Sequence, residues 1–143
     1  MLVGVGCFLY LILLVNEPAQ ADQKSSFCVI VHPEVTPTNL ETRFVADVFL
    51  KKITRWDGGK AIHPVDLPGS SVTRQLFSEQ VIKRSVTAVR NYWQQRIFSG
   101  RDVPPPEVDS EKSVIKFVST HAGAIGYVSC DMELSGVKSV ALR

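Results

Sequence analysis

The hydrophobic positions after residue 25 fall into short apolar runs that alternate with helix-like stretches. Residues 27–31 form a continuous apolar run, as expected for a strand that is covered on both faces. Between residues 40 and 49 the apolar side chains recur every three or four positions, which is typical of an amphipathic helix. Thr38 and Glu41 have the spacing of a capping box, which predicts that this helix begins near Thr38.

The rest of the chain continues the alternation of strands and helices. The turn and cap residues between the apolar runs set the expected boundaries. In order, the pattern predicts a strand over 62–67, a polar turn over 68–71, a helix containing Phe77 and Ile82, a helix from Ser85 to Gly100, an extended proline-rich loop over 101–108, a helix from Asp109 or Ser110 to Gly123, and strands over 124–129 and 137–142.

Alternating strands and helices indicate an α/β domain. Parallel neighbouring strands need long crossover connections, and the predicted helices supply them. We therefore expect a three-layer sandwich, in which helices flank a mainly parallel or mixed sheet.

The first apolar run predicts export. Residues 2–15 are apolar, but 14 residues fall short of the roughly 20 that a membrane-spanning helix needs. Ala19 and Ala21 are small residues at the two positions that a signal peptidase reads. We expect a signal peptide over residues 1–21 and a single domain over 22–143, in the periplasm or otherwise exported. Residues 1–4 carry no Lys or Arg, so an uncleaved membrane anchor is the alternative.

Charge and cysteine content narrow the picture further. The chain has 16 Lys plus Arg against 14 Asp plus Glu, a net charge of +2, which excludes a strongly basic nucleic-acid binder. Removal of residues 1–21 leaves Cys28 and Cys130. An even number of cysteines in an oxidising compartment favours a disulfide, and two buried thiols are the alternative.

One segment carries candidate binding chemistry. Ligands of open α/β sheets bind at the carboxyl ends of strands, and the polar turn over 68–71 has that position. Ser70, Ser71 and Thr73 supply hydroxyl groups there, and Arg74 adds a planar set of charged donors. Together with a helix N-terminus they form the outline of an oxyanion site. The alternative is that the hydroxyl groups are only helix caps.

Three motifs resemble a known family. Residues 45–56 resemble a helix that ends in an aromatic turn, residues 71–74 (Ser-Val-Thr-Arg) resemble a Ser-Gly-Thr-Arg phosphate loop, and residues 123–128 resemble the segment that returns to the other lobe. All three, in this order, resemble the C-terminal lobe of the phosphate-binding proteins of ABC transporters. The resemblance implies a type II periplasmic-binding-protein fold, phosphate or a similar oxyanion as the ligand, and neighbouring strands beside Cys28 and Cys130.

Two departures from the family lead to a second hypothesis. Val72 stands where the family has Gly, and the sequence provides for one lobe of the two that would enclose a ligand. The alternative function is a non-catalytic adaptor or structural subunit of a cell-envelope complex, with an envelope protein as its partner. Contact with a membrane is expected only if residues 1–21 remain attached.

Catalysis and metal binding lack support in the sequence. His32, His63 and His121 are far apart and lie in none of the usual metal-binding spacings. No Gly-x-Ser-x-Gly motif surrounds Ser70 or Ser71. We therefore expect no enzyme activity and no cofactor.

Overall fold

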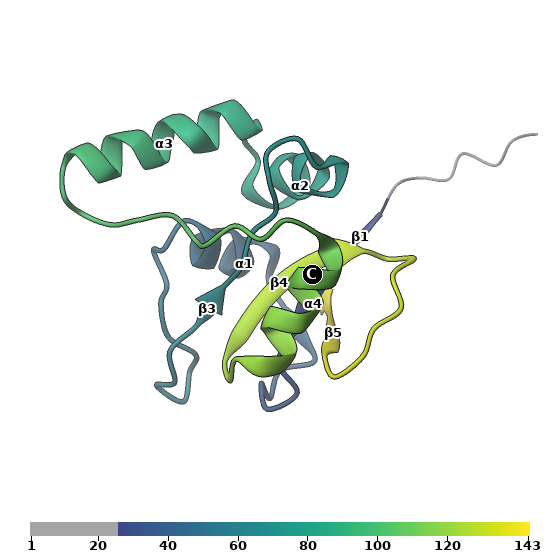
Figure 1. The fold of residues 1–143 in the computed structure, drawn as a ribbon. Coiled ribbons are helices and arrows are strands. Elements are labelled where there is room, and N and C mark those ends of the chain that lie inside the picture. Colours follow the sequence, from purple (N-terminus) through teal and green to yellow (C-terminus); the bar gives the residue numbers. More distant parts are fainter. Residues whose placement is uncertain (1–25) are drawn as a thin grey trace, which may run out of the picture.

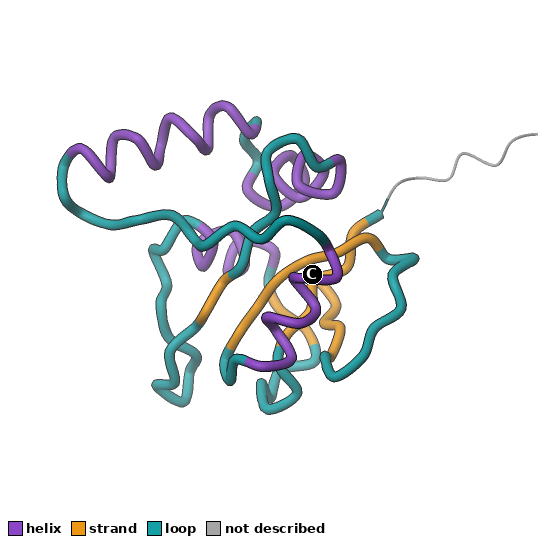
Figure 2. Tube along the Cα trace, in the orientation of Figure 1, coloured by secondary structure: helices purple, strands orange, loops and turns teal. Residues whose placement is uncertain are grey.

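Strand β1 (Phe27–Val31) lies in the middle of a five-stranded sheet (Figures 1 and 2). The computed structural model describes residues 26–143, so the predicted signal peptide and its cleavage site lie outside the described residues. The elements after β1 are, in chain order, β2 (Asn39–Leu40), α1 (Thr42–Phe49), β3 (His63–Pro64), α2 (Val72–Phe77), the π-helical turn η1 (Ser78–Ile82), α3 (Val86–Phe98), α4 (Glu111–Thr120), β4 (Ala124–Ser129) and β5 (Lys138–Leu142).

The sheet is mixed. Its strand order is β2-β5-β1-β4-β3, and β1 runs antiparallel to both of its neighbours, β4 and β5. The two outer pairs, β2 with β5 and β3 with β4, are parallel. The expectation of a largely parallel sheet therefore holds only for the outer pairs. A continuous apolar run reports burial on both faces but contains no information on strand direction.

Helices cover both faces of the sheet, which gives the three predicted layers. On one face Gly126 of β4 lies against α4, where a Cβ at this position would stand 2.7 Å from Val114 and 3.2 Å from Val118. On the opposite face Tyr127 stacks on Phe77 of α2 with ring centroids 3.8 Å apart. In Figure 1, α4 lies in front of β4, and α1 lies behind the sheet.

The start of α1 differs from the prediction. The helix begins at Thr42 with Glu41 as its N-cap, and no side chain caps it. The prediction of a capping box that starts the helix at Thr38 is therefore wrong. The main-chain oxygen of Thr38 instead accepts a hydrogen bond from Ala141, 3.0 Å away, and Asn39 and Leu40 pair with β5. Residues that the local spacing predicts to be helical instead pair with β5, a strand that is distant in the sequence.

Cys28 and Cys130 form a disulfide. Cys28 belongs to β1, and Cys130 follows β4 directly, so the antiparallel pairing of these strands brings the two Cα atoms to 5.0 Å. The bond ties together two segments that are 102 residues apart in the sequence.

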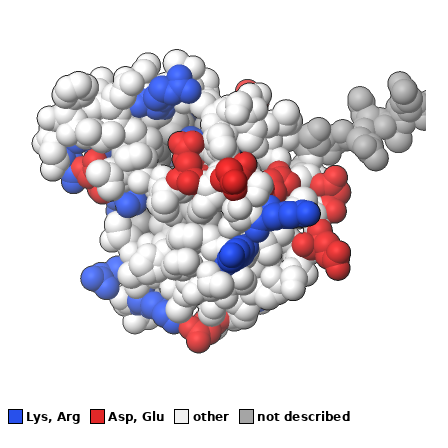
Figure 3. Space-filling view, viewed as in Figure 1, with Lys and Arg blue, Asp and Glu red and all other residues white. Residues whose placement is uncertain are grey.

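Figure 3 shows basic and acidic side chains scattered among uncharged ones on the face seen in Figure 1. Within residues 26–143 no helix has the length and apolar character to cross a membrane. Any attraction for an anion on this face must therefore come from local groups.

Candidate functional site

The polar turn over residues 68–71 leads directly into α2. The Ser71 amide donates a hydrogen bond to the Pro68 oxygen, 2.9 Å away, which closes the turn. Ser71 is the N-cap of α2, and its Oγ accepts from the Arg74 amide at 3.2 Å. Ser70 is exposed at the tip of the turn. The predicted hydroxyl groups therefore stand at the helix start, and that of Ser71 is already used as a cap.

Val72, which replaces the family's glycine, is the first residue of α2 and is 63% exposed. Among the described non-glycine residues, positive φ angles occur only at Lys51 and Lys83. The backbone at Val72 thus needs no glycine, and its side chain points to solvent.

Arg74 is buried, unlike the rim position that its place in the sequence predicts. Its side chain is 8% exposed and forms an ion pair with Asp66, whose side chain is equally buried. The Arg74 Nη1 also donates to the Leu67 oxygen at 3.3 Å. Helix α2 packs on strands β1 and β4, so residues on its inner side point back into the domain.

Asp66 is the centre of this buried cluster. Its Oδ1 accepts from the Leu67 amide at 2.9 Å and from the hydroxyl of Tyr127. Burial, together with the negative charge of Asp66, raises the pKa of Tyr127 well above its usual range. Burial alone would lower the pKa of Arg74, but the adjacent Asp66 carboxylate outweighs burial and raises it. The cluster therefore holds one compensated pair of charges beside a neutral phenol.

Thr73 is held by a second internal carboxylate. Its hydroxyl donates to Oε1 of Glu111, the first residue of α4, and the same oxygen accepts from the Ser129 amide at 3.2 Å. Two of the predicted donors therefore already bind carboxylates of the domain: Thr73 binds Glu111, and Arg74 binds Asp66.

A cavity of about 250 Å³ opens on the α3 side of this cluster. Arg74 Nε is buried and has no hydrogen-bond partner within residues 26–143, and Arg74 and Asp66 both line the cavity. Arg90 of α3 lines it too, with its Nη2 3.5 Å from where a Cβ on Gly69 would stand. The cavity is therefore lined by two arginines, the buried Arg74, whose Nε has no partner within residues 26–143, and the exposed Arg90 beside the turn.

The loop between α3 and α4 forms the other wall of this cavity. It is extended, as predicted, and crosses above the sheet (Figure 2). The Asp66 amide donates to the Pro106 oxygen at 2.9 Å, and the Val108 amide donates to the Asp66 oxygen at 3.0 Å. Pro105 and Glu107 line the cavity.

Sequence reasoning found the donors of this site but missed its acceptors. Asp66 is the one charged residue in the apolar run over 62–67, and an isolated carboxylate in a buried strand needs a partner. The sequence therefore contained a signal that Asp66 needs a buried partner. The contributions of Glu111 and Arg90 depend on how α3 and α4 pack, and no local pattern marks them.

Comparison with known proteins defines the fold class of the domain. No protein-family model matches the chain, and no curated protein matches it. Solved structures do match it over one lobe of phosphate ABC transporter substrate-binding proteins. The chain spans less than half the length of these proteins, and at these identities the match defines the fold. The domain therefore has the fold of a single periplasmic-binding-protein lobe.

Three of the matching structures illustrate the relationship. A putative phosphate ABC transporter substrate-binding protein with bound phosphate from Clostridium perfringens has a TM-score of 0.66 at 20% identity, covering 82% of this chain and 45% of that one. An ABC-type phosphate transport receptor from Vibrio cholerae has a TM-score of 0.65 at 20% identity, and the match covers 82% of this chain and 46% of the receptor. PstS from Borrelia burgdorferi has a TM-score of 0.63 at 16% identity, and the match covers 83% of this chain and 47% of PstS. The names of the first two are those of a substrate-binding protein and a transport receptor.

Proposed function

We propose that this protein is an exported, non-catalytic binding lobe that holds phosphate or a related oxyanion in the cavity beside Arg74. One observation carries the proposal. The Nε of Arg74 is a buried donor without a partner within residues 26–143, and the Arg74 side chain lines a cavity at the turn where the sequence predicts an oxyanion site. A buried N–H group without an acceptor is costly, and an anion in the cavity would satisfy it.

The lining residues suggest how an anion would be bound. Arg74 would donate from Nε while its Nη1 remains on Asp66, and Arg90 would donate from the opposite side. An oxyanion with four oxygens needs roughly four times the 30 Å³ of a water molecule, which the 250 Å³ cavity provides. Asp66 and Glu107 balance the two arginines, so the affinity should be modest.

Calorimetry with phosphate and sulfate tests this proposal. We expect Arg90→Gln to weaken binding about tenfold, because it removes a charge-assisted donor at an exposed site. Arg101→Gln is the matched control, since Arg101 is exposed and does not line the cavity. The double variant Asp66→Asn/Arg74→Gln replaces the buried ion pair by two amides and should abolish binding in a folded protein. Absence of heat with the wild type at millimolar anion would refute the proposal.

Export rests on the sequence expectation of cleavage after Ala21 and on the Cys28–Cys130 disulfide, a bond typical of oxidising compartments. The secreted form should begin at Asp22. Intact mass spectrometry of the protein from its native host checks this, and a mass that still includes residues 1–21 would instead indicate an anchored protein.

A second candidate function is an adaptor subunit of a cell-envelope complex. Phe98 at the end of α3 is 92% exposed, and Ile97 and Val103 beside it in the sequence are also exposed. Three exposed apolar side chains so near to one another in the sequence make this end of α3 a candidate interaction site. Thr73 and Arg74 bind Glu111 and Asp66 of the same domain, so in this second candidate function they stabilise the fold and bind no ligand. Calorimetry without any anion response would favour the adaptor.

A further inference from the structure

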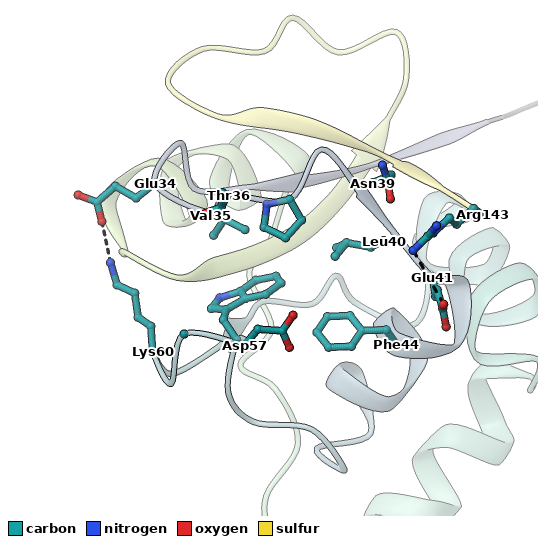
Figure 4. A pocket seen from close by; sticks show the side chains of 13 residues that line it. Glu34, Val35, Thr36, Asn39, Leu40, Glu41, Phe44, Asp57, Lys60 and Arg143 are labelled. Atoms are coloured by element: carbon teal, nitrogen blue, oxygen red, sulfur yellow. Dashed lines mark hydrogen bonds and ion pairs between the residues drawn. The ribbon is translucent and has the colours of Figure 1, made fainter.

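A second, larger cavity is separate from the Arg74 site. It has a volume of about 720 Å³ and is bounded by β2, α1 and the turn over residues 56–60 (Figure 4). Its volume falls in the range of small-molecule sites, which is roughly 300 to 1,000 Å³. It shares no lining residue with the cavity beside Arg74. We refer to it as the Trp56 groove.

The floor of the Trp56 groove is aromatic and aliphatic. The rings of Phe44 and Trp56 lie with their centroids 5.8 Å apart and tilted by 34°. Trp56 is fixed in place because its Nε1 donates to the Gly123 oxygen at 3.0 Å. Val35 and Leu40, both at most 6% exposed, complete the floor. The groove therefore offers preformed aromatic surface rather than a mobile side chain.

The charges around the groove are unequal. Glu34, Glu41 and Asp57 line it, against Lys60 and Arg143. Lys60 Nζ lies 2.7 Å from Glu34, and Arg143 lies 4.0 Å from Glu41, so each cation already has a carboxylate. These pairs stand at opposite ends of the groove in Figure 4.

Asp57 is the carboxylate that is left over. It makes no hydrogen bond or ion pair within residues 26–143, and in Figure 4 its carboxylate points into the groove towards the ring of Phe44. A carboxylate beside an aromatic floor attracts a cation by charge, while the ring faces attract it through their quadrupoles.

We propose that the Trp56 groove binds a small organic cation with an apolar or aromatic body, such as an arylalkylamine. The body lies on Phe44 and Trp56, and the ammonium group donates to the carboxylate of Asp57. Neutral and anionic molecules of the same shape bind less well, because Lys60 and Arg143 are already paired and Asp57 is not.

Three probes of nearly equal shape test the proposal: 2-phenylethylammonium, 2-phenylethanol and phenylacetate. Binding is followed by the NMR shift of the Trp56 indole N–H, which distinguishes this groove from the surroundings of Trp93. We expect the cation to bind about tenfold more tightly than the alcohol, the scale of one charge-assisted bond with a cation–π contact. Phenylacetate should bind more weakly than the alcohol.

Two variants that remove one exposed charge each complete the test. Asp57→Asn keeps the shape of the side chain and should abolish the preference for the cation over the alcohol. Glu79→Gln is the matched control, since Glu79 is exposed and does not line the groove, and it should leave that preference intact. Equal affinity for cation and alcohol in the wild type, a preference that survives in Asp57→Asn, or no shift of the Trp56 signal would overturn the proposal.

Discussion

At the scale of single residues, the most consequential feature is the burial of Asp66 and Arg74. A buried ion pair is a poor source of net stability, but removal of one partner leaves an uncompensated charge and costs about 3 to 5 kcal/mol. Arg74→Ala should therefore destabilise the fold as well as any binding, which the sequence alone did not predict. For this reason the binding tests rely on Arg90 and on a paired replacement.

The first prediction concerns Tyr127 at alkaline pH. Burial and Asp66 raise its pKa in the folded protein, whereas in the unfolded chain it titrates near its usual value of about 10. The folded state thus retains a proton that the unfolded state loses, so the free energy of unfolding should fall as pH rises above about 10. Urea unfolding at several pH values measures this.

Tyr127→Phe is the control for this prediction. It has no phenol to titrate, so its stability should fall less steeply over the same alkaline range, although it is less stable than the wild type at neutral pH because Asp66 loses a donor. Equal slopes for the two proteins would contradict the raised pKa.

The second prediction concerns Gly123, which precedes β4. Its φ is +82°, and a Cβ there would lie 2.4 Å from the Ala61 oxygen. Gly123→Ala should lower the free energy of unfolding by at least about 2 kcal/mol, because left-handed backbone alone costs an alanine about 1 to 2 kcal/mol. Gly58→Ala has open space around it and ordinary φ, so chemical denaturation should show a change within about 0.5 kcal/mol.

At the scale of elements, the helix caps are local and the strand partners are not. Ser71, Ser85 and Ser110 each cap the helix that follows, and each accepts from the amide three residues later. The sequence predicted a cap at Ser85 and another at Asp109 or Ser110, since a cap depends on neighbours along the chain. It misplaced the start of α1, because Asn39 and Leu40 pair with β5 about 100 residues away.

The third prediction tests the cap of α3. The Ser85 Oγ accepts from the Ala88 amide at 3.1 Å. Ser85→Ala should cost about 1 kcal/mol, the usual value of an N-cap hydroxyl. Thr87→Ala, at an exposed position of the same helix, should be close to neutral or slightly stabilising. Thermal or urea unfolding gives both values, and a loss in Thr87→Ala as large as in Ser85→Ala would argue against a specific cap.

At the scale of the whole molecule, the disulfide joins the beginning and the end of the folded domain. β1 pairs with β4 and β5, so most of the chain lies between strands that must meet in the centre of the sheet. Closing that long loop costs conformational entropy in folding. A covalent link between Cys28 and Cys130 removes much of this cost from the unfolded state.

The fourth prediction is that this link contributes strongly to stability. For a loop of 102 residues the chain-entropy model gives about 4 to 5 kcal/mol as an upper estimate. The double variant Cys28→Ser/Cys130→Ser should therefore unfold at a much lower urea concentration than the oxidised wild type. Reductant should destabilise the wild type and leave the double variant unchanged; a wild type indifferent to reductant under unfolding conditions would refute the prediction.

The sequence by itself determined the features that depend on neighbouring residues. The apolar runs predicted β1 and β4 with their observed bounds, the caps predicted α3 and α4, and the alternation of elements predicted an α/β domain of three layers. The resemblance of three short motifs pointed to the lobe that the structural comparison then showed. Periodicity, capping and turn chemistry act over a few residues, so one sequence is enough to recognise them.

Tertiary structure alone decided the direction of β1, the pairing of β2 with β5 and the environment of the candidate site. Arg74 faces inward because α2 packs on β1 and β4, and there it pairs with Asp66; Thr73 bonds to Glu111, the first residue of α4. The Trp56 groove likewise joins residues between 34 and 60 with Arg143. These contacts link residues far apart in the chain, and their geometry follows from packing rather than from any local pattern.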